Sequence, residues 1–246
     1  MPIIDSGDYN GDGTSDIGFF RPSVGLWSIR NVGTDFFGSN GDTPVSGDYD
    51  GDGTADIGIW RPGSSLWYVR AVSRYYFGSV GDIPAPADYD GDGICDPAIF
   101  RPSAGFWFSP GLTRLTFGQN GDIPVPADYN DDGTAEFGIF RPTSALWSIR
   151  GVSRTYFGAS SDYPVPGYYD GLGARIAVFR AASGLWVIKN LSRFYFGSSA
   201  DWPVSADYRG DGSDLSAIFR RSAGLWSVKD FTRVYWGTSD DVPVTR

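Results

Sequence analysis

Residues 43–78 read "TPVSGDYDGDGTADIGIWRPGSSLWYVRAVSRYYFG", and the chain contains six related copies of this stretch. Each copy carries a tryptophan after Leu or Phe, an arginine after a short apolar run, and an aromatic–glycine pair near its end. These markers repeat every 40 residues, with a single step of 39 between the fourth and fifth copies. Such a period is typical of propeller blades. The tryptophan marker is found at Trp27, Trp67, Trp107, Trp147, Trp186 and Trp226.

The second copy divides into four short segments that are rich in strand-forming residues. They are residues 43–49, 55–61, 65–70 and 73–78, and the breaks between them read "DGDG", "PGS" and "AV". Four short strands in about forty residues are typical of one propeller blade. An open β-solenoid fits less well, because its coils are shorter and its ends need caps. The sequence therefore predicts an all-β fold, a six-bladed β-propeller of four-stranded antiparallel blades.

We expect the whole chain, residues 1–246, to form a single propeller domain. Its two ends, "MPIIDSGDY" and "DVPVTR", both resemble the opening of a copy. They therefore compete for one strand position or fill it together, and the sequence leaves open which end does so. The predicted repeats are residues 1–42, 43–82, 83–122, 123–162, 163–201 and 202–241, with a closing segment at 242–246.

Composition narrows the class of protein and its partners. Aromatic residues make up 16 % of the chain and lysine and glutamate are almost absent, which favours strands over helices. The net charge of −9 repels nucleic acid, so we expect no nucleic-acid partner. No apolar run reaches eighteen residues, so we expect no membrane insertion. No signal-peptide pattern follows Met1, and we expect an excised mature domain.

The acidic loop at residues 48–56, "DYDGDGTAD", is the one pattern that indicates site chemistry. Side-chain oxygens occupy loop positions 1, 3, 5 and 9, and a glycine occupies position 6, where the chain must turn sharply. Alternate side chains then converge on one point, while the carbonyl of position 7 points inward. A hard divalent cation collects six or seven oxygens from such a loop, and Mg²⁺ fits less well because it prefers to keep several waters.

The first four copies keep all of these oxygen donors. Asp-Gly runs are also good hairpin turns, but a turn alone would not keep an oxygen donor at position 9. We therefore interpret the loops as metal sites, and the only glutamate of the chain falls on one of their ligand positions. The predicted ligands, with the position-7 residue of each loop, are Asp8, Asn10, Asp12, Thr14, Asp16, Asp48, Asp50, Asp52, Thr54, Asp56, Asp88, Asp90, Asp92, Ile94, Asp96, Asp128, Asn130, Asp132, Thr134 and Glu136.

The last two copies depart from this pattern. The fifth reads "YYDGLGAR", with Tyr168 at position 1, Leu172 at position 5 and one residue fewer. The sixth has Arg209 at position 3 and Leu215 at position 9. We therefore expect about four metal sites, with the fifth and sixth copies empty. Four divalent cations would bring the net charge from −9 to about −1, so metal binding should add directly to folding stability.

At these residues the chain resembles the FG-GAP and VCBS repeat proteins of bacteria and, more distantly, the propeller of integrin α subunits. The shared features are the "D-x-D-G-D-G-x-x-D" loop, the following "DIGIWRP" or "AIFRP" strand, and the Phe-Gly near the end of each copy. The resemblance covers the whole chain and implies Ca²⁺ in the loop between the first two strands of a blade. It also implies a secreted or surface-borne domain that serves in adhesion, in carbohydrate or protein binding, or as a module attached to an enzyme.

Two further residue series recur in the copies. The six tryptophans and an arginine series could line sugar pockets between blades, as in six-bladed fucose-binding lectins, but we favour packing, with each arginine paired to an aspartate. A second arginine series lies on the outermost strand, where we expect it to protect the edge, and Asp35 takes its place in the first copy. The aspartates expected to pair are Asp42, Asp82, Asp122, Asp162, Asp201 and Asp241, and the outer arginines are Arg74, Arg114, Arg154, Arg193 and Arg233.

Catalysis is disfavoured by what the chain lacks. It contains no histidine, so no imidazole base or triad exists, and Cys95 therefore has no histidine partner. We expect a non-enzymatic, calcium-stabilised module for binding or adhesion to a glycan or protein, located outside the cell or on its surface because extracellular calcium modules bind at millimolar concentration. The alternative is a structural spacer of a larger secreted protein with no ligand of its own. Lectin-like sugar sites between blades and an enzyme-associated domain are more distant alternatives, and the ligand and oligomeric state stay open.

Overall fold

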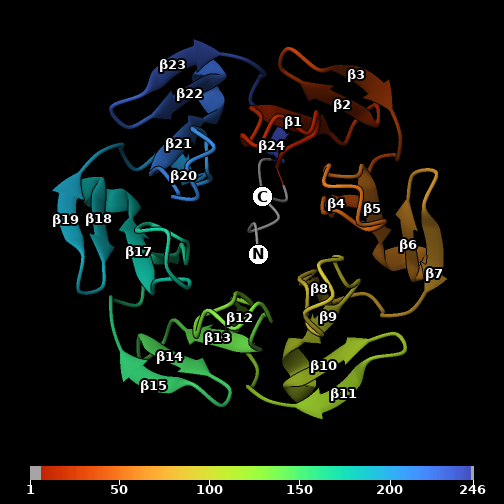
Figure 1. Ribbon diagram of the computed structural model, residues 1–246, viewed down its shortest axis with the longest axis horizontal. Helices are drawn as coiled ribbons and strands as arrows, with labels where there is room; N and C mark the ends of the chain where they lie inside the picture. Colours follow the sequence, from red (N-terminus) through yellow and green to blue (C-terminus); the bar gives the residue numbers. More distant parts are fainter. Residues whose placement is uncertain (1–6, 245–246) are drawn as a thin grey trace. The chain divides into compact units, whose positions relative to one another are not determined.

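The computed structural model describes residues 7–244, which form six four-stranded antiparallel sheets (Figure 1). The predicted fold class is confirmed: the chain is an all-β, six-bladed propeller. The described residues divide into two compact units, one of residues 80–199 and one of residues 7–79 with 200–244. Each unit contains three blades. The predictions that concern residues 1–6 and 245–246 lie outside the described part of the chain.

The unit of residues 80–199 contains blades 3, 4 and 5. Each has a two-residue innermost strand followed by strands of three or four residues, joined in chain order. Blade 3 consists of β8 (Ile83–Pro84), β9 (Ile99–Arg101), β10 (Phe106–Ser109) and β11 (Thr113–Thr116); blade 4 of β12 (Ile123–Pro124), β13 (Gly138–Arg141), β14 (Leu146–Ile149) and β15 (Ser153–Tyr156); and blade 5 of β16 (Tyr163–Pro164), β17 (Ala177–Arg180), β18 (Leu185–Ile188) and β19 (Ser192–Tyr195).

The second unit contains blades 6, 1 and 2. Its strands are β20 (Asp201–Pro203), β21 (Ala217–Arg220), β22 (Leu225–Val228) and β23 (Thr232–Tyr235) in blade 6; β1 (Gly18–Arg21), β2 (Leu26–Ile29), β3 (Gly33–Phe36) and β24 (Val242–Pro243) in blade 1; and β4 (Thr43–Pro44), β5 (Gly58–Arg61), β6 (Leu66–Val69) and β7 (Ser73–Tyr76) in blade 2. The only helical elements of the described chain are four short 3-10 turns, η1 (Pro62–Ser64), η2 (Pro102–Ala104), η3 (Ala181–Ser183) and η4 (Arg221–Ala223).

The innermost strands are shorter than the sequence predicts. The expected strand at residues 43–49 is reduced to β4, which ends at Pro44, although the N–H of Val45 still donates to the carbonyl of Gly58 at 2.9 Å. Beyond this bond, an isolated bridge pairs Gly47 with Asp56. The acidic loop therefore begins and ends at this bridge, which holds its two ends together.

The C-terminal segment fills the strand position that the sequence leaves open. Strand β24 pairs with β1, so that Val242 lies opposite Phe20. In addition, the hydroxyl of Tyr9 donates to the carbonyl of Val244 at 2.7 Å. All five other blades have the same bond, from the hydroxyl of the tyrosine at loop position 2 to the carbonyl four residues earlier. The C-terminal segment thus takes the part of an ordinary innermost strand in blade 1.

The six tryptophans of the repeat form the centre of the blade cores. Each is at most 1 % exposed and lies opposite an aromatic residue of the neighbouring strand, as Trp147 lies opposite Phe140 with ring centroids 5.2 Å apart. The indole N–H of Trp147 donates to the carbonyl of Phe157 at 3.1 Å. Because both ring faces lie within the core, these tryptophans cannot stack on a sugar. The packing interpretation is therefore the correct one for this series.

Each blade also contains a bidentate ion pair between arginine and aspartate, as the packing interpretation predicts. The Nε–Oδ1 distances are 2.6–2.7 Å, and the aspartate side chains are at most 1 % exposed. Two parallel hydrogen bonds to one carboxylate make the pair strong and fix its geometry. The pairs are Arg21–Asp241, Arg61–Asp42, Arg101–Asp82, Arg141–Asp122, Arg180–Asp162 and Arg220–Asp201.

Two sequence details are explained by the backbone. The glycine of each aromatic–glycine pair has a φ between 82° and 108°, a conformation that side chains strongly disfavour, so the repeat retains glycine there. The strand register corrects the place of the outer arginine in the first copy: Thr34 pairs with Ser28 as Arg74 pairs with Tyr68. The equivalent residue is therefore Thr34 and not Asp35.

No helix of the described chain is long and apolar enough to cross a membrane.

Candidate metal centre

The acidic loops connect the first and second strands of the blades, and hydrogen bonds between their ends close them. In blade 2 the closing bridge joins Gly47 to Asp56, and Asp56 accepts the N–H of Tyr49 at 2.9 Å. In blade 1 the N–H of Asp16 donates to the carbonyl of Gly7 at 2.7 Å. The residue at position 9 is thereby returned to the side of positions 1 and 2. Equivalent bridges join Ala87 to Asp96 and Ala127 to Glu136.

The carboxylate at position 1 organises the inside of each loop. In blade 2, Asp48 is 1 % exposed, and its two oxygens accept the N–H groups of Gly51 at 2.7 Å and Gly53 at 2.9 Å. Asp52 accepts the N–H and the hydroxyl of Thr54 at 2.8 and 2.6 Å. These are the local turns that aspartate side chains form with the backbone that follows them. Asp8, Asp88 and Asp128 accept the equivalent N–H groups of their loops.

Three of the four predicted loops bring three carboxylates together. In each, one oxygen of every member lies within 4.8 Å of the others. The groups are Asp48, Asp50 and Asp56; Asp88, Asp90 and Asp96; and Asp128, Asp132 and Glu136. The structure thus brings nine predicted ligand residues together in three groups, and the three members of each group lie close enough to share one ion.

The predicted ligands Asp52 and Asp92 lie outside these groups. In the fourth loop an amide lies beside the carboxylate group: Asn130 donates from its Nδ2 to Glu136 at 2.5 Å. To offer oxygen to a metal, this amide must turn by half a rotation, which exchanges its nitrogen and oxygen.

The loop of blade 1 does not form such a group of three carboxylates. The Nδ2 of Asn10 lies 3.1 Å from both carboxylate oxygens of Asp16, and Asp12 accepts the N–H of Thr14 at 2.9 Å. The amide therefore stabilises the ionised Asp16 by hydrogen bonding, without adding a positive charge. Of the four predicted sites, this loop is the least complete as it stands.

The surroundings of the carboxylate at position 9 disfavour its charge. Burial, together with the charges of neighbouring aspartates, raises the pKa of Asp16, Asp56 and Asp96 to about 6. Burial also raises the pKa of Glu136. In each loop the carboxylate at position 9 is therefore ionised at a cost, and a cation placed among the oxygens would remove that cost.

The predicted carbonyl ligands at position 7 stay predictions. The N–H groups of these residues donate to the carboxylate at position 5, at distances of 2.8–2.9 Å. These bonds place the residues on the rim of their loops. They concern Thr14, Thr54, Ile94 and Thr134.

In blade 5 an arginine stands where the first four loops have a carboxylate. The closing bridge joins Gly167 to Arg175, so Arg175 occupies the closing position although the loop is one residue shorter. Its Nε lies 3.0 Å from both oxygens of Asp170 and its Nη2 lies 2.6 Å from Oδ2. The loop therefore carries its own cation. Sequence reasoning noted the lost ligands and missed this pair, although the final arginine of "YYDGLGAR" was its signal.

In blade 6 the arginine at position 3 points away from the loop. The Nη2 of Arg209 donates to the carbonyl of Asp230 at 3.3 Å, and its guanidinium lies 5.4 Å from the ring centre of Phe231. Asp207 still accepts the N–H groups of the turn, and Leu215 forms the closing bridge with Ala206. The turn is thus retained without a carboxylate at its closing position.

Neighbouring loops are joined by backbone hydrogen bonds within each unit. The N–H at position 8 of one loop donates to the carbonyl at position 1 of the preceding loop, at 2.5–2.7 Å. The fifth loop keeps this bond, from Ala174 to Asp128, although it lacks the predicted ligand residues of the first four loops. Such bonds leave no side-chain signal, so the sequence could not reveal them. The four bonds are Ser15–Asp207, Ala55–Asp8, Ala135–Asp88 and Ala174–Asp128.

No family model matches the chain, and no curated protein matches it. The resemblance to FG-GAP and VCBS repeats therefore rests on the loop and strand motifs of the sequence and on the propeller fold.

Proposed function

We propose that this chain is a non-enzymatic, calcium-stabilised β-propeller that serves outside the cell as a binding or adhesion module for a glycan or protein. The observation that carries the proposal is the convergence of three carboxylates in each of three loops that have the same internal hydrogen bonds. Convergent like charges destabilise a fold unless a counter-ion joins them. A bound cation would therefore stabilise these loops, whereas a plain turn without converging carboxylates would gain nothing from it.

The donor set fits calcium. In blade 2 the ion would be held by Asp48, Asp50 and Asp56, with Asp52 and the carbonyl of Thr54 as further oxygens. All of these are hard oxygen donors, and Ca²⁺ takes six to eight of them in flexible geometry, whereas Mg²⁺ keeps several waters. When bound, the ion supplies the positive charge that this loop lacks. The pKa of about 6 at Asp56 indicates the need for that charge at the closing position.

The fifth and sixth loops support an unequal distribution of ions. The guanidinium of Arg175 already neutralises Asp170, and Leu215 gives loop 6 no carboxylate at its closing position. We therefore assign about four ions to the first four loops and none to the last two. The complete groups in loops 2, 3 and 4 should bind most tightly.

A role without catalysis is part of the proposal. It is supported by the engagement of the Asp48 carboxylate with loop N–H groups and by the lack of histidine in the sequence. The extracellular setting is proposed because loops of this kind suit the millimolar calcium found outside cells. A structural spacer is the second candidate, since the tryptophans and the Arg–Asp pairs serve packing.

Two measurements test this proposal. Calorimetric titration of the full chain with CaCl₂ should give about four sites, and MgCl₂ should compete weakly. A glycan array and a pull-down from native extracellular material then separate the two candidates. Binding in either favours the module, and silence in both favours the spacer. A titration without calcium binding contradicts the proposal in both forms.

A further inference from the structure

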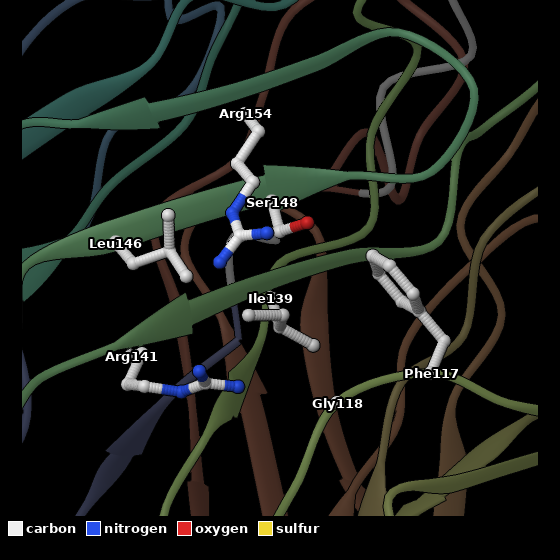
Figure 2. Close-up of a pocket in the computed structure, with 7 residues that line it drawn as sticks. All are labelled: Phe117, Gly118, Ile139, Arg141, Leu146, Ser148 and Arg154. Atoms are coloured by element: carbon white, nitrogen blue, oxygen red, sulfur yellow. The ribbon is translucent and has the colours of Figure 1, made fainter.

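A small pocket lies on blade 4, away from the acidic loops, and it is confined to the unit of residues 80–199 (Figure 2). Its volume is about 160 Å³. Phe117 and Gly118, which follow blade 3, form one wall, and residues of β13, β14 and β15 form the other. Drug-sized sites measure about 300–1,000 Å³, so this pocket suits a single small ring.

Two arginines flank the pocket, and only one of them is paired. Arg141 uses its Nε and Nη2 to bind Asp122, at 2.7 and 2.8 Å. Arg154 has no ion pair or hydrogen bond within the described part of the chain. Figure 2 shows its guanidinium beside Ser148, on the side of Ile139 opposite to Arg141.

Comparison with the other blades shows that Arg154 has no ring on which to stack. Arg154 lies opposite Ser148 in the strand register, as Arg233 lies opposite Ser227 in blade 6. In blade 3 the equivalent pair is Arg114 and Phe108, and the guanidinium lies 4.8 Å from the ring centre. In blade 2 the equivalent Arg74 lies 5.6 Å from the ring centre of Tyr68. The serine removes the ring on which the arginine would otherwise stack.

The chemistry of the walls defines a ligand. A guanidinium is a planar fork that binds a carboxylate through two parallel hydrogen bonds. The partly exposed ring of Phe117 can contact the C–H face of a sugar, while the hydroxyl of Ser148 can bond a sugar hydroxyl. We propose that this pocket binds a uronic acid unit of an acidic glycan, with the carboxylate on Arg154. This assignment rests on the proposed function as a glycan-binding module.

The test is an NMR titration of the calcium-loaded full chain, in which the Nε–Hε signal of Arg154 is assigned with R154A. We expect D-glucuronate at millimolar concentration to shift this signal, and D-glucose at the same concentration to shift it at least fivefold less. Sodium sulfate at equal ionic strength should also shift it at least fivefold less. Equal shifts with sulfate would reduce the pocket to a general anion site and overturn the sugar assignment.

Variants of the pocket complete the test. Ser148→Phe introduces the residue that blade 3 has at this position and should reduce the glucuronate shift of Arg154 at least fivefold. Ser148→Val, which copies Val187 of blade 5, serves if the phenylalanine variant fails to fold. Arg74→Ala, in the arginine series but in a blade with a ring at that position, should leave the shift unchanged.

No shift of Arg154 with glucuronate, or a shift that Ser148→Phe and Ser148→Val leave intact, overturns the assignment. In either case calcium-dependent melting and binding of neutral glycans would be unaffected. The failure of this pocket is therefore distinguishable from the failure of the proposed function.

Discussion

The guanidinium of Arg175 donates to both carboxylate oxygens of Asp170, and it does so at the closing position of an acidic loop where blades 2 and 3 have an aspartate. One loop of the propeller therefore contains a covalently attached cation in the place where its neighbours collect carboxylates. The loop keeps its backbone bond to the preceding loop, from Ala174 to Asp128 at 2.6 Å. Shape has been retained here while the proposed need for metal has been lost.

Arg175→Ala should lower stability slightly and by the same amount with and without calcium. The two side chains of the pair are 39 % and 23 % exposed, so the pair contributes about 0.5 kcal/mol, or about 1–2 °C in Tm. Differential scanning fluorimetry in CaCl₂ and in EGTA measures both values. A change in stability that differs between calcium and EGTA would mean that the ion acts at loop 5, contrary to the account.

Asp56→Asn should remove one calcium site of about four. The variant takes one of three converging carboxylates from loop 2 while keeping an acceptor for the N–H of Tyr49. Calorimetric titration should show the lower stoichiometry. Asp170→Asn in loop 5 is the matched control and should leave the stoichiometry unchanged, because that carboxylate is already paired with Arg175. Equal losses in both variants would contradict the assignment of sites.

Arg180→Ala should destabilise the protein strongly in calcium and in chelator alike. It leaves the carboxylate of Asp162, whose side chain is 0 % exposed, without its cation. An uncompensated buried charge of this kind costs about 2–3 kcal/mol when water reaches it partly, or about 5–10 °C in Tm. Arg193→Ala, on the exposed outer strand of the same blade, should change Tm by less than about 2 °C. A small effect of Arg180→Ala would show that the ion pairs do not hold the blades.

Much of the fold could be predicted because the markers of the repeat have structural causes. The tryptophans fill the blade cores, the arginines pair with buried aspartates, and the glycines adopt positive φ. The inner strands were predicted too long, since regular pairing ends just after Pro44 and only an isolated bridge, Gly47 to Asp56, follows. The end that completes blade 1 could not be predicted, because both ends have the same pattern and only the pairing of Val242 with Phe20 decides between them.

The candidate site was predictable where it depends on side-chain spacing. Asp48, Asp50 and Asp56 converge as their positions in the loop imply. The Arg175–Asp170 pair was missed, because a one-residue deletion hides the register that the bridge to Gly167 restores. The bonds between loops were missed because backbone groups are the same in every residue. The pocket beside Arg154 was missed because it depends on a side chain, that of Ser148, being small.

The central claim is that calcium holds this propeller together through its acidic loops, and the melting temperature tests it most directly. Like charges converge in three loops, so removal of the ion should lower Tm by many degrees. Scanning calorimetry of the full chain in 2 mM CaCl₂ and in EGTA, with MgCl₂ as the control ion, should show a loss of about 10 °C or more in EGTA that calcium restores and magnesium restores poorly. The same Tm in calcium and in EGTA would contradict the account.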